Sequence, residues 1–173
     1  MAIQVKRILV PLDFSEHAES ILAWASHLAK EHGSSLILIH AYHLPVEFQQ
    51  MEGAYLPAEF WTQVKTEAEK TLEAHAAALR AGGLEVEVEV VEGYPATAIE
   101  EAVARKNADL VVIETHGHTG LKHLLLGSVA ERVVQKAPCP VLTVKAPEPD
   151  ARREGGAVEG QGGPPASRRE EKG

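Results

Sequence analysis

The chain has little that would suit it to a membrane, a disulfide framework or a nucleic acid. Its single cysteine, Cys139, excludes an internal disulfide. No apolar run approaches the 18 or so residues of a membrane-spanning helix, and the N-terminal sequence lacks the apolar core of a signal peptide. Lysine and arginine number 17 against 25 acidic residues and do not gather with aromatic residues. We therefore expect a cytoplasmic protein with no membrane span and no nucleic-acid partner.

Several sequence motifs of cofactor and catalytic sites are also missing. No GxGxxG follows the first apolar run, and GxxxxGK[ST] occurs nowhere, which disfavours dinucleotide cofactors and P-loop motors. Ser128 has no GxSxG context, so we assign no catalytic residue. The histidines do not have the spacing of zinc ligands, and we expect no metal site among them. The histidines considered are His40, His43, His116, His118 and His123.

The length and composition indicate one folded domain followed by a tail. At 173 residues and 45% hydrophobic content, the chain can build a single core. From residue 146 onwards, glycine, proline and charged residues dominate, and large apolar side chains are scarce. We predict a domain over residues 1–145 and a disordered tail over 146–173.

Within the domain, five short apolar runs alternate with four amphipathic segments. The first run, at residues 7–13, is rich in branched residues, as is typical of a buried strand. Alternating strands and helices indicate a parallel α/β sheet with right-handed crossovers. The strands are expected at 7–13, 35–42, 84–91, 109–115 and 140–145. The helices are expected at 15–32, 59–80, 95–106 and 121–137.

Local signals refine these boundaries. Ser15 is a candidate N-cap for the first helix, and Gly33 is expected to end that helix. Valines and glutamates alternate in the third strand, which is typical of an edge strand exposed on one face. Residues 43–58 lack a clear period and are interpreted as a variable loop or lid.

The stretch ETHGHTGLKHLLLGSVAERV, from Glu114, carries three glycines where the fourth strand gives way to a helix. Ligands of open parallel sheets bind at the carboxyl ends of the strands, where the winding reverses. If the first strand is central, Asp13 at its end faces this stretch across the crevice. Glycine lets a backbone approach a ligand closely, and free amides near a helix start suit a phosphate. The alternative is that the glycines only form a tight turn.

Both ends of the domain resemble the universal stress protein family. The resemblance covers residues 1–145 through ILVPLDFSEHAESILAWASHLAKEHGSSLILIHAY and THGHTGLKHLLLGSVAERVVQKAPCPVLTVK. The nucleotide-binding branch has Gly, two residues, Gly, nine residues, then Gly with Ser or Thr. Gly117, Gly127 and Ser128 match this pattern, whereas Glu114 occupies the position of the first glycine.

The resemblance implies an open five-stranded parallel sheet of order 3-2-1-4-5 with helices on both faces. It also implies a stress-response protein that binds ATP, with or without Mg²⁺, hydrolyses it slowly at most, and forms a homodimer through Val141 to Lys145. The alternative is a nucleotide-free dimeric interaction module of the same family. The implied nucleotide-binding residues are Pro11, Leu12, Asp13, Ala41, Ile113, Glu114, His116, Gly117, Gly127, Ser128 and Val129.

Two of these residues have a second interpretation. Asp13 could instead help to cap the first helix together with Ser15. Glu114 could repel a phosphate, because two unit charges about 4 Å apart at an effective dielectric of 20 repel by roughly 4 kcal/mol. It could also accept a hydrogen bond from a ribose hydroxyl.

Overall fold

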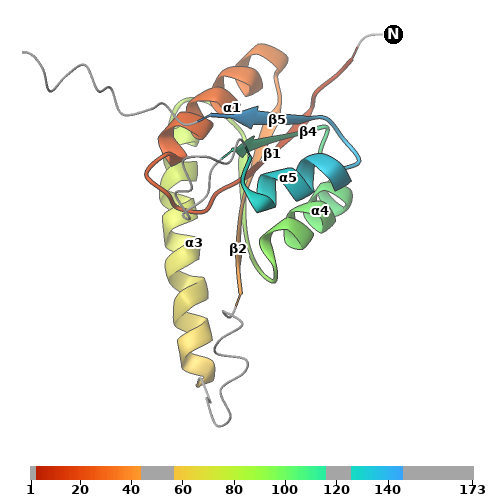
Figure 1. Ribbon diagram of the computed structural model, residues 1–173. Helices are drawn as coiled ribbons and strands as arrows, with labels where there is room; N and C mark the ends of the chain where they lie inside the picture. The colour runs from red at the N-terminus through yellow and green to blue at the C-terminus, as the bar shows by residue number, and fades with distance from the viewer. Residues whose placement is uncertain (1–2, 44–56, 116–125, 146–173) are drawn as a thin grey trace, which may run out of the picture.

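A five-stranded parallel sheet forms the centre of the molecule (Figure 1). The computed structural model describes residues 3–43, 57–115 and 126–145. The strand order is β3-β2-β1-β4-β5, as predicted. The strands are β1 (Arg7–Pro11), β2 (Ser35–Tyr42), β3 (Val86–Glu92), β4 (Leu110–Glu114) and β5 (Val141–Val144). The helices are α1 (Ala18–His32), α3 (Ala58–Ala81), α4 (Pro95–Lys106) and α5 (Ser128–Lys136).

The helices cover both faces of the sheet, which explains why the central strands are apolar throughout. Alternate side chains of a strand point to opposite faces. Ile8 and Val10 therefore pack in the core beneath α1 and α3, whereas Leu9 packs in the core beneath α4 and α5. These three side chains are fully buried. Each such side chain contributes about 1.5–3 kcal/mol of transfer free energy, so both cores stabilise the domain.

Strand β2 runs past the end of β1 by three residues. Their pairing ends with Pro11 opposite Ile39, and the Leu12 amide makes one further hydrogen bond to the Ile39 carbonyl at 2.9 Å. On its other side, β2 stays paired with β3 as far as Tyr42. The Gly93 amide then donates to the Tyr42 carbonyl at 2.8 Å, which ties the ends of β2 and β3 together. This overhang of β2 projects beyond the end of β1 (Figure 1).

The predicted alternation of valine and glutamate in β3 is confirmed, and the outward glutamates contact the C-terminal end of α4. Arg105 donates two hydrogen bonds to Glu89, at 2.7 and 3.1 Å, and Lys106 pairs with both Glu89 and Glu87. The hydrogen bonds from Arg105 lower the pKa of the Glu89 carboxyl below its ordinary value. Cations in the last turn of a helix also suit its dipole, so this cluster holds α4 against the sheet edge.

Two predicted helix starts are wrong. Helix α1 begins at Ala18 with His17 as its N-cap, and no described side chain makes a capping hydrogen bond there. Ser15 lies too far upstream to cap it and bonds elsewhere. Helix α5 begins at Ser128, because Gly127 has an extended backbone with φ −70° and ψ 154°. The apolar spacing that continued upstream to residue 121 therefore does not describe one helix.

Other boundaries match the prediction closely. Helix α4 has the predicted ends, and α1 ends at Gly33, whose left-handed φ of 65° suits glycine. The predicted loop at 43–58 and tail at 146–173 lie almost entirely outside the described residues. Among the helices that the structure describes, none is long and apolar enough to cross a membrane.

The predicted domain boundary can be tested by truncation. The described core ends with β5, and none of the described core residues lies beyond Val144. A chain that ends at Lys145 should therefore unfold at the same temperature as the full chain, within about 1 °C, in a thermal melt followed by circular dichroism. A fall of several degrees would place part of the fold's stability in residues 146–173.

Candidate functional site

A cavity of about 360 Å³ opens at the carboxyl ends of the strands. Its walls come from the ends of β1, β2 and β4 and from the first turns of α4 and α5. Strand β1 pairs with β2 on one side and with β4 on the other, so the cavity lies where the winding of the sheet reverses. This is the position at which open parallel sheets bind ligands.

The cavity has two chemically different sides. The β4–α5 side carries three polar side chains, those of Glu114, Thr115 and Ser128, whereas the β2–α4 side is apolar apart from His43. The β4–α5 side consists of Ile113, Glu114, Thr115, Gly127, Ser128, Val129 and Ala130. The β2–α4 side consists of Ile39, Ala41, His43, Pro95 and Ile99. Pro11, Leu12, Asp13, Ala18 and Ile21 lie between them.

The β4–α5 side presents the N-terminus of a helix to the cavity. Gly127 is the N-cap of α5, and no side chain among the described residues caps this end. The first amides of an α-helix have no acceptor within the helix, and they carry the positive end of its dipole. Ser128, Val129 and Ala130 supply three of these amides and all line the cavity. This side can therefore bind an anion such as a phosphate.

Ser15 contacts both carboxylates of the cavity wall. Its backbone amide donates to Asp13 Oδ1 at 3.0 Å, and its hydroxyl donates to Glu114 Oε2 at 3.3 Å. Glu114 Oε1 is buried. The two carboxylates end adjacent strands of the sheet, and Ser15 holds them at the cavity. Asp13 thus shapes the turn before α1 rather than capping the helix itself.

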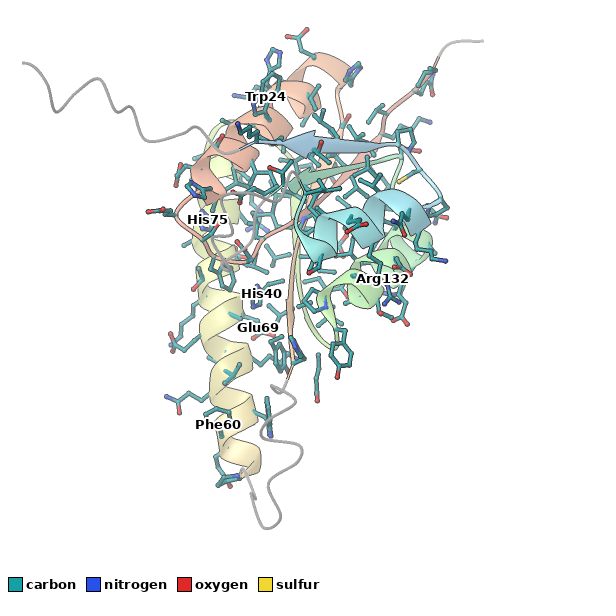
Figure 2. The ribbon with its side chains drawn as sticks, viewed as in Figure 1. Trp24, His40, Phe60, Glu69, His75 and Arg132 are labelled. Carbon is teal, nitrogen blue, oxygen red and sulfur yellow. The ribbon has the colours of Figure 1, made fainter. Side chains whose placement is uncertain are left out.

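The turn that carries Asp13 is also anchored from the opposite face of the sheet. His40 Nδ1 lies 2.8 Å from the Leu12 carbonyl, so this nitrogen carries the proton and donates. The His40 ring stacks on Phe14 with a centroid distance of 4.0 Å and an interplanar angle of 19°. Phe14 has a φ of 60°, a left-handed conformation that a bulky residue adopts only where its surroundings require it. Figure 2 shows His40 between the sheet and α3.

On the β2–α4 side, the overhang of β2 turns backbone groups toward the cavity. Alternate residues of a strand direct both their N–H and their C=O to the same neighbour. The Ile39 carbonyl accepts from β1, so Ala41, two residues further on, faces the same way. Strand β1 has ended by then, and no described strand lies beside Ala41 on that side. Ala41 thereby offers a ligand a hydrogen-bond donor, its N–H, next to an acceptor, its C=O.

The predicted nucleotide-binding residues converge on this cavity. Nine of the eleven line it, and their nucleotide contacts stay a prediction; the other two, His116 and Gly117, lie outside the described residues. The nine are Pro11, Leu12, Asp13, Ala41, Ile113, Glu114, Gly127, Ser128 and Val129. The sequence interpretation missed the other eight residues of the wall, because the fold brings strand ends and helix starts together at this edge of the sheet. They are Ala18, Ile21, Ile39, His43, Pro95, Ile99, Thr115 and Ala130. Proline at a helix start is the signal that could have identified Pro95.

His40, in β2, and His43, directly after β2, lie at different sites. His40 lies in the groove beneath α3, whereas His43 lines the cavity. In the part of the chain that the structure describes, no three or more His, Cys, Asp or Glu side chains are arranged to hold a metal ion. Cys139 is partly buried beside the α4–α5 core, and burial raises the pKa of its thiol. An elevated pKa keeps the thiol protonated and unreactive.

Comparison with known proteins agrees with this fold. The model of the universal stress protein family matches residues 4–145. Universal stress protein MJ0531 of Methanocaldococcus jannaschii is 37% identical over 148 residues, which cover 83% of this chain and 84% of the relative. The solved structure of MJ0577, from the same organism, superposes with a TM-score of 0.74 at 31% identity and covers 85% of this chain and all of the other.

A third relative was solved with a ligand. It is the universal stress protein from Archaeoglobus fulgidus in complex with dAMP, with a TM-score of 0.58 and 25% identity, over 83% of this chain and 100% of that one. The matched residues contain every described strand and helix of this chain. The chain therefore belongs to the universal stress protein family.

Proposed function

We propose that this protein binds an adenine nucleotide, ATP in particular, in the cavity at the carboxyl ends of β1, β2 and β4, and that it acts as a homodimeric regulatory protein of the cytoplasmic stress response. The observation that carries the proposal is the pairing of an apolar side with an anion-binding side in one cavity. A nucleotide has the same two parts. The dAMP bound by the relative from Archaeoglobus fulgidus supports the ligand class.

The base fits the β2–α4 side. Ile39, Pro95 and Ile99 supply apolar walls on which a planar ring can pack. Adenine carries an acceptor, N1, beside a donor, the N6 amino group, and the N–H and C=O of Ala41 are complementary to this pair. The base would thus replace the missing length of β1 beside β2.

The phosphates fit the β4–α5 side. In the proposed complex, amides at the start of α5 donate to phosphate oxygens, and the extended Gly127 lets the ligand approach the backbone. Asp13, at the end of the central strand, would accept a hydrogen bond from a ribose hydroxyl. Gly117 and His116 are proposed to complete the phosphate contacts, together with Mg²⁺ where it accompanies ATP.

The direct test is mass spectrometry of small molecules released from the purified, denatured protein. A co-purified adenine nucleotide, with calorimetric binding of ATP but not UTP to the emptied protein, is the expected result. Failure of ATP, ADP, AMP and adenosine to bind a folded sample would reject the proposal. That outcome would favour the second candidate, a nucleotide-free dimeric interaction module, to which the Glu114 carboxylate in the cavity wall points.

Glu114→Gln should raise the affinity for ATP. The variant keeps the size of the side chain and an oxygen that can accept from the Ser15 hydroxyl, but it removes a negative charge near the phosphates. We expect an increase of about tenfold at low salt and less at high salt, because screening already weakens the repulsion. Calorimetric titrations at two salt concentrations measure both effects.

Adenosine is the control for this variant, because it has no phosphate to repel. Its affinity should be the same for wild type and Glu114→Gln. If the variant instead weakens adenosine and ATP equally, Glu114 accepts a hydrogen bond from the ribose, and the repulsion argument is wrong.

A further inference from the structure

We infer that His43 and Tyr94 form an aromatic rim at the β2–α4 side of the cavity, with His43 stacking on the bound base and Tyr94 positioning its ring. The inference rests on the proposed function, because it assigns the base an additional contact. His43 follows the last residue of β2 and lines the cavity. Its ring lies against that of Tyr94, with centroids 4.9 Å apart and an interplanar angle of 42°.

The backbone around the pair keeps the two rings together. The hydrogen bond from the Gly93 amide to the Tyr42 carbonyl joins the residues that directly precede Tyr94 and His43. Tyr94 is in turn the N-cap of α4, and its carbonyl accepts from the Ala98 amide at 2.9 Å. Both rings therefore stand on hydrogen-bonded backbone, and Tyr94 directly precedes Pro95, which lines the cavity.

Exposure of the tyrosine points to a role other than core packing. Tyr94 is 53% exposed, so its ring gains little from burial in the described structure. A half-exposed aromatic ring that supports a histidine at a cavity mouth fixes the plane that the histidine offers to a ligand. Histidine stacks on nucleobases as the larger aromatic side chains do. Ala41, two residues before His43, faces the same cavity, so the two contact regions adjoin.

The rim contacts the base, so a change in the rim should affect ligand affinities differently from a change on the β4–α5 side. His43→Ala should weaken binding of adenosine, AMP and ATP by the same factor, about tenfold, which lies within the effect of removing one base-stacking aromatic ring. Changes on the β4–α5 side should instead depend on the number of phosphates. His27→Ala is the matched control, because His27 is an exposed histidine of α1 that does not line the cavity.

Tyr94 is tested as a positioning residue. Tyr94→Ala should reproduce most of the loss seen with His43→Ala, and Tyr94→Phe should restore wild-type affinity, because the ring and not the hydroxyl supports His43. The ultraviolet absorbance of adenosine provides a second readout, since stacking lowers the absorbance of the base. A fall in absorbance on binding to wild type and to Tyr94→Phe, with a much smaller fall for His43→Ala, is expected.

The outcomes separate this inference from the proposed function. If wild type binds adenosine and His43→Ala binds it equally well, the rim is rejected while nucleotide binding stands. If His43→Ala loses affinity for ATP but not for adenosine, His43 contacts the phosphates, and the proposed rim is also rejected. Equal losses in Tyr94→Ala and Tyr94→Phe would reject the positioning role. If wild type binds no adenine compound at all, both proposals fall.

Discussion

Gly127→Val should abolish measurable ATP binding while leaving the fold intact. The Gly127 backbone is extended, a conformation that valine adopts readily, and its amide can still donate to the Thr115 carbonyl, 2.6 Å away in this structure. The added side chain would occupy space at the cavity wall beside the start of α5. Crowding of this kind costs about 3 kcal/mol or more, which weakens binding by at least 100-fold.

Calorimetric titration of ATP measures this loss, and a thermal melt establishes that the variant is folded. Gly127→Ala is the matched variant, because it adds one methyl group instead of three carbons and should give an intermediate loss. Wild-type affinity in a folded Gly127→Val protein would show that no ligand approaches this backbone, and our placement of the phosphates would be wrong.

Thr143→Pro should convert the proposed homodimer into a folded monomer. Strand β5 is the edge of the sheet. The Val111 amide donates to the Pro140 carbonyl and the Thr115 amide to the Val144 carbonyl, so these alternate positions of β5 face β4. The Thr143 amide then points away from β4, to the edge where a second copy would pair. Proline removes this donor without touching the pairing with β4.

Light scattering should show a mass near twice 18.7 kDa for wild type and near 18.7 kDa for Thr143→Pro. Thr143→Val, which keeps the amide, should remain dimeric. Leu142→Pro serves as the contrasting variant, because the Leu142 amide faces β4 and its loss should damage the fold itself. A wild-type protein that is monomeric at high micromolar concentration would refute edge pairing.

The sequence was most informative where the burial of apolar residues permits only one arrangement of strands and helices. Strands such as ILIHAY in β2, apolar on both faces, predict a sheet covered by helices on both sides, and the alternation of β3 predicts an edge. Proline and glycine marked the ends of α4 and α1 correctly, because their backbone preferences act locally. The resemblance supplied the strand order, which the described strands confirm.

The sequence was least informative where long-range contacts decide local structure. Ser15 is of a residue type that is favoured at helix N-caps, yet its hydroxyl donates a hydrogen bond to Glu114, 99 positions away. The start of α5 could not be predicted from apolar spacing, because the extended conformation of Gly127 interrupts a pattern that looks continuous. The contact between His43 and Tyr94 depends on the hydrogen bond between the ends of β2 and β3, which no local pattern predicts.

The overhang of β2 also bears on how long the protein survives in a cell. In the proposed complex, adenine paired to Ala41 would take the place of a strand residue, and it would bind only the folded chain. A ligand present at 100 times its dissociation constant then adds about 2.7 kcal/mol to the free energy of unfolding. Proteases that act on the unfolded chain would meet it about 100-fold less often. The abundance of the protein would therefore follow the supply of nucleotide, with no change in the shape of the domain.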